Sequence, residues 1–403
     1  MIDRPIYLQK LIDFKDKEQI KVITGIRRCG KSSLLELFAK YLISLNINNS
    51  NIIQLNFEDL KYVNMTYIEL NNYIEETIKS LNGKVYLLID EIQKIKKWEL
   101  TINSLRLNKK LDIYITGSNA YLLSSELSTY LSGRYVEIKI QPLIFKEFVN
   151  FYNFSASTTK EEKFNLFFKY GGMPGLVELN FNEQAISQTL EGIFSTVLTK
   201  DIISKSIIKE PALLKKITDF LADNIGNPTS INNIKNTLIS KKSISKGTKP
   251  ETIDNYILFL CNAFVFYNIK RYDIKGKEYL STQNKYYIVD MGIRNYLLGF
   301  RNLDRGHILE NIVFLELLSR GYNISIGKID NREIDFIVTT STEKKYIQVC
   351  ETLNSQEIRN REIKSLEKIK DNYEKIVLTT DNIFTSTDFN GIKTLNLIDW
   401  LLS

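Results

Sequence analysis

The residues best suited to chemistry lie near the amino end, where an apolar stretch leads into two glycines, a lysine and a serine. Residues 25–32 read Gly-Ile-Arg-Arg-Cys-Gly-Lys-Ser, which is the spacing of a phosphate-binding loop, GxxxxGK followed by Ser or Thr. Main-chain N–H groups and a helix amino end present partial positive charge to a phosphate there. Lys31 is expected to reach the β- and γ-phosphate oxygens, and the Ser32 hydroxyl to bind Mg²⁺.

The surroundings of this loop fit the same interpretation. Residues 20–24 form a short apolar strand before it, and residues 33–45 carry apolar side chains at helical spacing after it. Strand, loop and helix are the context that the motif requires. Whether Arg27 and Arg28 face phosphate or solvent stays open. The residues expected to contact the nucleotide are Gly25, Ile26, Arg27, Arg28, Cys29, Gly30, Lys31, Ser32 and Ser33.

Two acids follow a second apolar run. Residues 85–89 are continuously apolar, as expected of a central parallel strand that is buried on both faces, and Asp90 and Glu91 come next. Ligands bind at the carboxyl ends of strands in open α/β sheets, so both acids are expected to face the nucleotide. Asp90 would hold Mg²⁺ through a water molecule, and Glu91 would polarise the attacking water. The alternative is a solvated strand end.

A third strand is predicted over residues 111–115 and ends in Thr-Gly-Ser-Asn, which would bring Ser118 or Asn119 close to the γ-phosphate. Strands and helices alternate elsewhere in this part of the chain, which predicts an α/β fold with a parallel sheet of about five strands. The remaining expected strands are 51–56 and 136–140, and the expected helices are 66–81 and 96–109.

Residues 21–150 resemble a large group of bacterial and archaeal predicted ATPases of the AAA type. The shared motifs are the phosphate loop 25–32, Asp-Glu-Ile-Gln at 90–93, Gly-Ser-Asn at 117–119, Gly-Arg-Tyr at 133–135 and Pro-Leu-Ile-Phe-Lys-Glu-Phe at 142–148. The resemblance implies an ATPase domain over residues 1–150 that uses ATP and Mg²⁺. It implies that Asn119 is the sensor residue. It also makes Arg134 a candidate for contacting the γ-phosphate, in cis or from a neighbouring subunit, with a structural salt bridge as the alternative.

The middle of the chain is expected to hold two helical modules. Residues 151–208 resemble the family's helical lid, broken by the turn Gly-Gly-Met-Pro-Gly at 171–175, for which an ordinary interhelix turn is the alternative. Residues 209–295 resemble a winged helix-turn-helix, which implies DNA contact or, alternatively, a packing role. The side chains expected to meet DNA phosphates are Ser243, Ser245, Lys246, Thr248, Lys249, Lys270, Arg271, Lys275, Lys277 and Lys285.

The last part, residues 296–403, resembles the restriction-endonuclease-like α/β fold. Glu310 on a helix, Asp335 on a strand and Gln348 on the next strand would form a second metal site by that resemblance. The lysine expected two residues after Gln348 is replaced by Cys350, whose thiol is largely neutral at pH 7. An active nuclease, an inactive module that binds nucleic acid or protein, and a purely structural domain therefore remain open.

The composition of the chain argues against several other classes of protein and of functional site. The chain has 403 residues, 43% hydrophobic and 25% charged, with a formal net charge of +7 that permits nucleic-acid binding without requiring it. A single histidine argues against sites built from several histidines. Three distant cysteines give no disulfide or zinc pattern, which fits a cytoplasmic protein. The amino end lacks a signal layout, and no apolar run approaches the roughly 20 residues of a membrane span.

Three functions remain as hypotheses. The leading one is a Mg²⁺-dependent ATPase whose nucleotide state repositions a winged helix and a nuclease-like domain. The second is an ATP-switched DNA-binding or scaffold protein with negligible turnover, and the third is an ATP-gated, metal-dependent nuclease. The sequence does not decide whether the protein forms a homo-oligomer or binds another protein.

Overall fold

The computed structural model describes residues 4–118, 131, 133–204, 208–280, 283–301, 305–382 and 388–403. Contacts between residues divide the chain into two compact units. The first unit comprises residues 1–141 with Asn262–Phe264, and the second comprises residues 142–261 and 265–403. Among the residues that the structure describes, no helix combines the length and the apolar character needed to cross a membrane.

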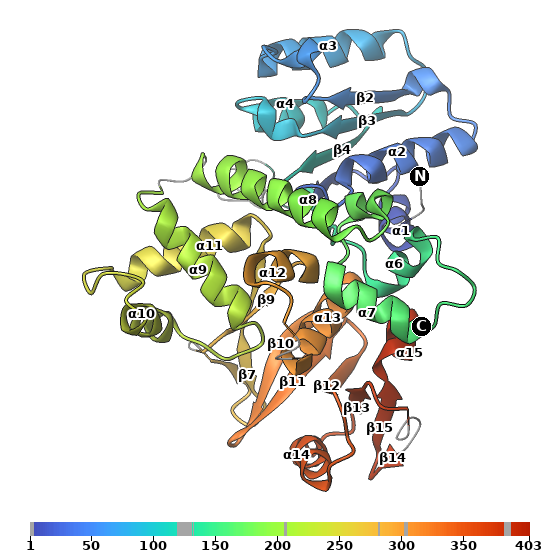
Figure 1. The fold of residues 1–403 in the computed structure, drawn as a ribbon. Coiled ribbons are helices and arrows are strands. Elements are labelled where there is room, and N and C mark those ends of the chain that lie inside the picture. The colour runs from blue at the N-terminus through green and yellow to red at the C-terminus, as the bar shows by residue number, and fades with distance from the viewer. Residues whose placement is uncertain are drawn as a thin grey trace. The chain divides into compact units, whose positions relative to one another are not determined.

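The first unit contains a parallel sheet of five strands in the order β2-β3-β4-β1-β5 (Figure 1). Every residue of β1, β3 and β4 is buried, as the continuous apolar runs predict for central strands. The α/β fold and its parallel sheet are thereby confirmed. The strands are β1 (Ile20–Thr24), β2 (Ile52–Asn56), β3 (Val85–Asp90), β4 (Leu111–Gly117) and β5 (Tyr135–Lys139).

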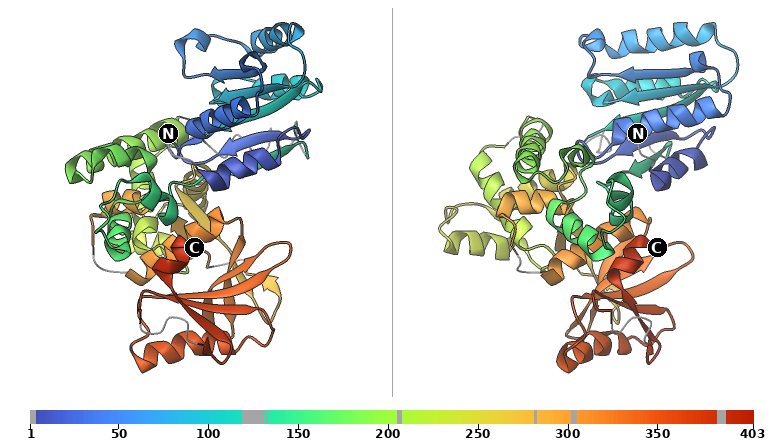
Figure 2. Two further views of the ribbon diagram at one scale, coloured as in Figure 1. Left: turned by 90° about the vertical axis from the view of Figure 1, so that its right-hand side faces the viewer. Right: turned by 45° about the vertical axis from the view of Figure 1, so that its right-hand side comes forward.

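Helices cover both faces of this sheet (Figure 2). Apolar residues of α3 and α4 form one core with β3 and β4, while Phe38 of α2 packs on Tyr114 at the other face. Thr66 and Glu69 form a capping box that fixes the start of α3. The helices are α1 (Pro5–Asp13), α2 (Lys31–Ser44), α3 (Tyr67–Lys79) and α4 (Trp98–Leu105), with short 3₁₀ turns η1 (Asn49–Asn51), η2 (Leu60–Tyr62) and η3 (Ile92–Lys94).

The second unit begins with a helical part. Its elements are α6 (Phe145–Phe151), α7 (Lys160–Tyr170), η5 (Pro174–Leu179), α8 (Glu183–Thr196), the π-helical η6 (Val197–Ile203), α9 (Pro211–Asp223), α10 (Ile231–Ser240), α11 (Pro250–Asn262) and α12 (Met291–Leu298). Strands β6 (Phe266–Ile269) and β9 (Lys285–Ile288) form an antiparallel pair between α11 and α12.

An eight-stranded mixed sheet completes the second unit, in the order β14-β15-β13-β12-β11-β10-β7-β8. Strands β7 and β8 come from the region that resembles a winged helix, yet β7 pairs with β10 of this sheet. The strands are β7 (Arg271–Asp273), β8 (Glu278–Tyr279), β10 (Asn323–Ile329), β11 (Arg332–Thr339), β12 (Lys344–Cys350), β13 (Glu374–Thr379), β14 (Asp388–Phe389) and β15 (Ile392–Asn396), and the helices are α13 (Arg305–Ser319), α14 (Gln356–Glu367) and α15 (Leu397–Leu402).

The glycine pair after α7 is held in place by a carboxylate. Gly171 has φ +74°, and an added Cβ would lie 2.4 Å from Asp290 Oδ1. Gly172 N–H donates to Asp290 Oδ2 at 2.6 Å, and Asp290 also caps α12 by accepting from Ile293 N–H. This contact gives the Gly-Gly turn a structural task within the second unit. The predicted boundaries inside that unit stay predictions.

Candidate nucleotide-binding site

The loop between β1 and α2 has the tight backbone that its glycines allow. Gly25 has φ +149°, and a Cβ there would lie 2.4 Å from the carbonyl oxygen of Ile140. Gly30 has φ +102° and caps α2 in a left-handed conformation. The buried side chain of Arg4 ties the loop to residue 141. Its Nη1 donates to the carbonyl oxygens of Cys29 at 2.9 Å and Gln141 at 3.0 Å. Sequence reasoning did not predict this Arg4 contact.

Lys31 folds back over the loop. Its ammonium donates to the carbonyl oxygens of Gly25 at 3.0 Å and Ile26 at 3.1 Å. Ser32 and Ser33 are exposed in the first turn of α2, whereas Cys29 is buried and its thiol pKa is raised by burial. Neutral carbonyl dipoles hold the ammonium, so its positive charge stays available to an anion at the helix amino end.

Asp90, the last residue of β3, and Glu91 after it are held in place by a side chain of β4. The Thr116 hydroxyl donates to Asp90 Oδ1 and accepts from Glu91 N–H at 3.0 Å. Asp90 and Glu91 are 6% and 7% exposed. Burial raises the pKa of Glu91, and the positive charge of Lys31 acts against that rise. Lys31 is thus close enough to act electrostatically on Glu91, as the expected nucleotide site requires.

Glu91 adopts an unusual backbone conformation. Its φ of +54° and ψ of +45° are left-handed, which is uncommon for a residue with a side chain. The chain turns there into η3, and Gln93 Nε2 donates to Glu91 Oε2. The same nitrogen lies 3.5 Å from Ser118 Oγ, which is buried at the end of β4. Sequence reasoning missed Gln93 as a contact of Glu91.

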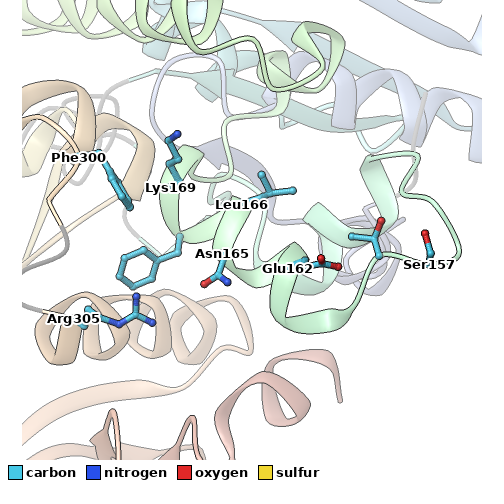
Figure 3. Close-up of a pocket in the computed structure, with 9 residues that line it drawn as sticks. Ser157, Glu162, Asn165, Leu166, Lys169, Phe300 and Arg305 are labelled. Carbon is cyan, nitrogen blue, oxygen red and sulfur yellow. The ribbon is translucent and has the colours of Figure 1, made fainter.

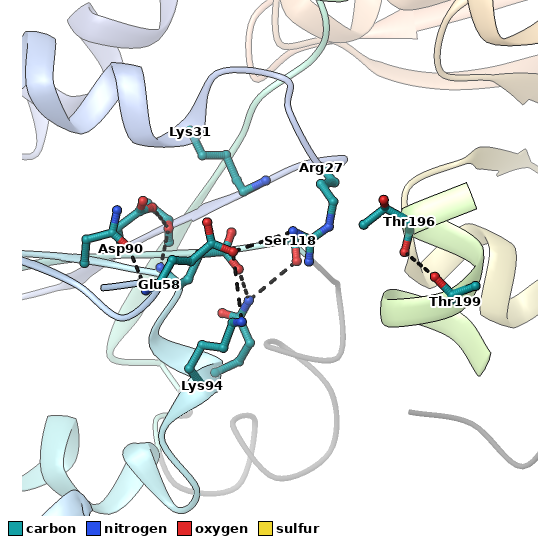
Figure 4. Close-up of polar contacts among 12 residues, drawn as sticks. Arg27, Lys31, Glu58, Asp90, Lys94, Ser118, Thr196 and Thr199 are labelled. Atoms are coloured by element: carbon teal, nitrogen blue, oxygen red, sulfur yellow. Dashed lines mark hydrogen bonds and ion pairs between the residues drawn. The ribbon is translucent and has the colours of Figure 1, made fainter. Parts of the chain in front are cut away.

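Charged side chains surround the mouth of the loop. Arg27 is partly buried and lies 3.8 Å from Glu58 Oε1, which also lies 4.0 Å from Lys94 Nζ (Figure 4). Arg28 is exposed and has φ +64°. Of the two arginines whose direction the sequence left open, Arg27 therefore faces an acid that follows β2, and Arg28 faces solvent. Glu58 was not predicted as a site residue, although it lies two residues after the end of a predicted strand.

Two expected residues remain, Asn119 and Arg134. Asn119 lies outside the described residues. Arg134 is exposed and directly precedes β5, where its carbonyl accepts from Ile20 N–H at 2.9 Å. Because β1 and β5 are parallel and pair from Ile20 with Tyr135 to Thr24 with Lys139, Arg134 lies at the amino edge of the sheet. The phosphate loop follows the opposite, carboxyl edge.

The predicted second metal site of the second unit holds a lysine. Lys285 Nζ lies 2.7 Å from Glu310 Oε1 and 2.6 Å from Glu333 Oε1, and Tyr287 Oη donates to Glu310 Oε1 at 2.6 Å. Burial alone would lower the pKa of Lys285, but Glu310, Asp335 and Glu333 hold it well above its ordinary value. Lys285 is 1% exposed, so the expectation that it meets DNA phosphate was wrong.

The other two predicted ligands are engaged with each other. Gln348 Oε1 accepts from Asp335 N–H at 3.2 Å, and Gln348 Nε2 donates to Glu362 Oε2 at 2.7 Å. Glu310, Asp335 and Gln348 line one cavity of about 820 Å³, so the structure does bring them together. Within the described residues, however, no group of three or more His, Cys, Asp or Glu side chains is arranged to hold a metal.

Cys350 is buried in this unit, and two of the basic residues expected to contact DNA lie close to acids. Burial raises the pKa of Cys350 to about 12, which keeps its thiol neutral, and the sulfur packs in the apolar core beneath α14. Lys275 pairs with Asp330 at 2.6 Å, and Arg271 lies 3.9 Å from Glu333. Two of the cations expected to contact DNA are therefore already paired with acids.

A second cavity of about 600 Å³ lies between α7 and the start of α13 (Figure 3). Lys169 and Arg305 project into it beside Phe300. Lys169 pairs with Glu183, and Arg305 Nε lies 2.6 Å from Glu351 Oε1. Both cations are thus compensated by acids of the same unit.

Comparisons with known proteins agree with the site in the first unit. A family described as "AAA domain" matches residues 17–149, and one described as "Domain of unknown function (DUF8612)" matches residues 161–304. A solved structure of the Aeropyrum pernix ORC1 protein in complex with DNA covers 74% of this chain and 92% of its own, at 10% identity and a TM-score of 0.32. A TM-score this low does not establish a common overall fold.

Two relatives match almost the whole chain. An uncharacterized protein of Haemophilus influenzae is 43% identical over 405 residues, which cover 100% of this chain and 99% of the relative. An uncharacterized protein of Methanocaldococcus jannaschii is 34% identical over 388 residues, which cover 92% of this chain and 82% of the relative. The chain therefore belongs to the same family as these two proteins, and its first unit is an AAA-type, ATP-binding domain.

Proposed function

We propose that the protein hydrolyses ATP in a Mg²⁺-dependent reaction. The observation that carries this proposal is the placement of Lys31, Asp90 and Glu91. A lysine whose ammonium is held only loosely by carbonyl dipoles lies opposite two buried acids at the carboxyl edge of a parallel sheet. This is the edge at which such sheets bind ligands.

The residues divide the chemical work as follows. Lys31 exchanges its carbonyl partners for β- and γ-phosphate oxygens, and the main-chain N–H groups of the loop bind the β-phosphate. The donor set for Mg²⁺ is the exposed Ser32 hydroxyl and the Asp90 carboxylate, and hard oxygen ligands of this kind suit Mg²⁺. When bound, Mg²⁺ supplies neutralisation of the phosphate charge. Glu91 accepts a hydrogen bond from the attacking water and then its proton.

Arg134 acts in this proposal from a neighbouring copy of the chain. Its position at the amino edge of the sheet, across β1 from the loop of its own unit, supports a role in trans over a role in cis. The test mixes two inactive variants, Lys31→Ala and Arg134→Ala. Recovered turnover in the mixture supports the shared site, whereas a mixture as inactive as its parts removes the trans role.

The second part of the proposal is that the nucleotide state repositions the second unit. Its support is the chain path, because the polypeptide passes between the units at 141/142 and again on both sides of Asn262–Phe264. A change in the first unit therefore has three covalent connections through which to act. Hydrogen exchange of the second unit with ATP, ADP or no nucleotide measures this coupling, and identical exchange in all three states rejects it.

The central experiment measures ATP binding and phosphate release by the full chain with Mg²⁺, with EDTA and with neither. We expect binding with micromolar affinity and slow turnover that EDTA abolishes. Binding without any turnover would instead favour an ATP-operated switch. Failure to bind ATP at all would remove the proposed function.

A further inference from the structure

The backbone at Glu91 directs the side chain of Gln93 toward the acid. Glu91 is left-handed, with φ +54°, and η3 starts at the next residue. This tight turn returns the chain on itself, so two side chains that are only two residues apart meet. The same turn is anchored to the sheet, because Glu91 N–H donates to the Thr116 hydroxyl.

Within the described part of the chain, the side-chain amide of Gln93 has hydrogen-bond partners at its nitrogen and none at its oxygen. Its Nε2 donates to Glu91 Oε2 and lies 3.5 Å from Ser118 Oγ. Its Oε1 is buried and has no hydrogen-bond donor among the residues that the structure describes. A buried carbonyl oxygen without a donor is costly, so a further donor is expected at this position. A water molecule beside the Glu91 carboxylate would supply one.

We propose that Gln93 is a positioning residue for ATP hydrolysis, which holds the Glu91 carboxylate with its amide N–H groups and keeps its carbonyl oxygen toward the water that Glu91 activates. The inference rests on the proposed ATPase function. It assigns a task to the fourth residue of the Asp-Glu-Ile-Gln motif, which the expected chemistry of Asp90 and Glu91 had left without one.

The effect of this contact can be measured apart from ATP binding. Charged groups already act on the Glu91 carboxylate, namely Lys31 of α2, Arg27 of the loop, Asp90 of β3 and Glu58 beyond β2. Gln93 contacts Glu91 and is not among the residues expected to bind the nucleotide or Mg²⁺. Loss of the Gln93 contact should therefore lower kcat much more than it lowers ATP affinity.

The experiment compares Gln93→Glu and Gln93→Ala with the wild-type chain. Gln93→Glu keeps the size of the side chain, replaces the donor by an acid and so separates hydrogen bonding from packing. Gln54→Glu is the matched control, because it makes the same chemical change at an exposed position of β2 in the same unit. ATP affinity, kcat and thermal midpoint are measured for all four proteins.

We expect kcat to fall about 10-fold in Gln93→Ala and about 100-fold in Gln93→Glu, with ATP affinity within about 3-fold of wild type. The control should match wild type.

The outcomes separate the inference from the proposed function. An active wild type whose kcat is unchanged in both Gln93 variants, or falls only as far as ATP affinity falls, overturns the inference and leaves the ATPase function intact. A rise in kcat also overturns it, since Gln93 would then restrain Glu91 instead of positioning it. A wild type that shows no turnover overturns the proposed function and the inference together.

Discussion

Two lysines, one in each unit, lie beside buried carboxylates and differ in what holds the ammonium group. Lys31 donates to two main-chain carbonyls, whereas Lys285 donates to the carboxylates of Glu310 and Glu333. Carbonyl dipoles leave the charge of Lys31 available to an anion, while two carboxylates compensate the charge of Lys285. A lysine near acids therefore indicates an anion site only where its own partners leave the charge uncompensated.

The carboxylates beside these two lysines, Glu91 and Glu310, differ in how strongly they hold a proton. Burial raises the pKa of Glu91, although Lys31 acts against it. Burial also acts to raise the pKa of Glu310, but Lys285, His307 and Tyr287 together hold it below its ordinary value. Glu310 is thus a stable, paired anion, whereas Glu91 is a carboxylate with increased proton affinity, as a base needs.

The largest effect that would test this comparison is expected for Lys285→Met, which leaves Glu310 buried without its cation. We expect the second unit to lose about 3–5 kcal/mol of unfolding free energy, while ATP binding stays unchanged. The sequence has two tryptophans, so in a Trp98→Phe background Trp400 reports urea unfolding of the second unit. The exposed Lys277→Met is the control, and equal stability of both variants would contradict a compensated pair.

Glu91→Gln tests the same comparison in the first unit, where the carboxylate is expected to act chemically and not structurally. We expect kcat for ATP hydrolysis to fall about 1000-fold, because glutamine cannot accept the proton of the attacking water. ATP affinity and thermal midpoint should stay close to wild type. Phosphate release under saturating ATP measures the effect, and unreduced turnover would remove Glu91 from its assigned role.

Asp290 sharpens the comparison because main-chain N–H groups hold it, whereas an ammonium holds Glu310. Burial raises the pKa of Asp290 to about 6, despite hydrogen bonds from Gly172, Ile293 and Gly292. The folded form therefore binds the proton more tightly than the unfolded form. Its contribution is complete below about pH 4 and is lost as the pH rises to about 6, a change on the order of 3 kcal/mol.

The measurement for Asp290 is the unfolding free energy of the second unit from pH 4 to pH 7, compared with Asp290→Asn. The variant lacks the titrating group, so the wild type should lose stability relative to it across this range. Parallel pH dependences of the two proteins would mean that the carboxyl does not titrate in the window.

The smallest of these effects is expected for Lys31→Ala, which removes the ammonium from the loop without leaving a buried charge unpaired. We expect ATP affinity to fall about 100-fold, since a charge-assisted contact to two phosphates is lost. The stability of the first unit should change little, because only two bonds to carbonyls disappear. Calorimetric titration measures the affinity, and an unchanged value would refute the assignment of the phosphate loop.

Local sequence patterns were sufficient for the first unit. The apolar runs before Gly25 and Asp90 predicted strands at the right positions, because a strand buried on both faces needs no alternation. The loop motif then located the bend, since only glycine fits the backbone at Gly25 beside Ile140. The partners Arg4, Glu58 and Gln93 were not predicted, because their contacts depend on side-chain directions that spacing does not specify.

In the second unit, sequence patterns did not predict which charged side chains pair with one another. Glu310, Asp335 and Gln348 line one cavity, as the sequence led us to expect. The lysine that pairs with Glu310 was not predicted. Lys285 comes from β9, 25 residues before Glu310 in the chain. A lysine at the start of an apolar strand was the available signal, and it was interpreted as an exposed cation.

The sequence by itself determined the phosphate loop, the acids of β3 and the parallel sheet, because each is encoded in a contiguous segment whose spacing has one favourable geometry. The tertiary structure alone decided which charges are compensated. Compensation depends on a few ångströms between groups that lie on different strands and helices, and the low dielectric of the interior makes those ångströms decisive. Lys31 and Lys285 have the same side chain, and the fold gave them different roles.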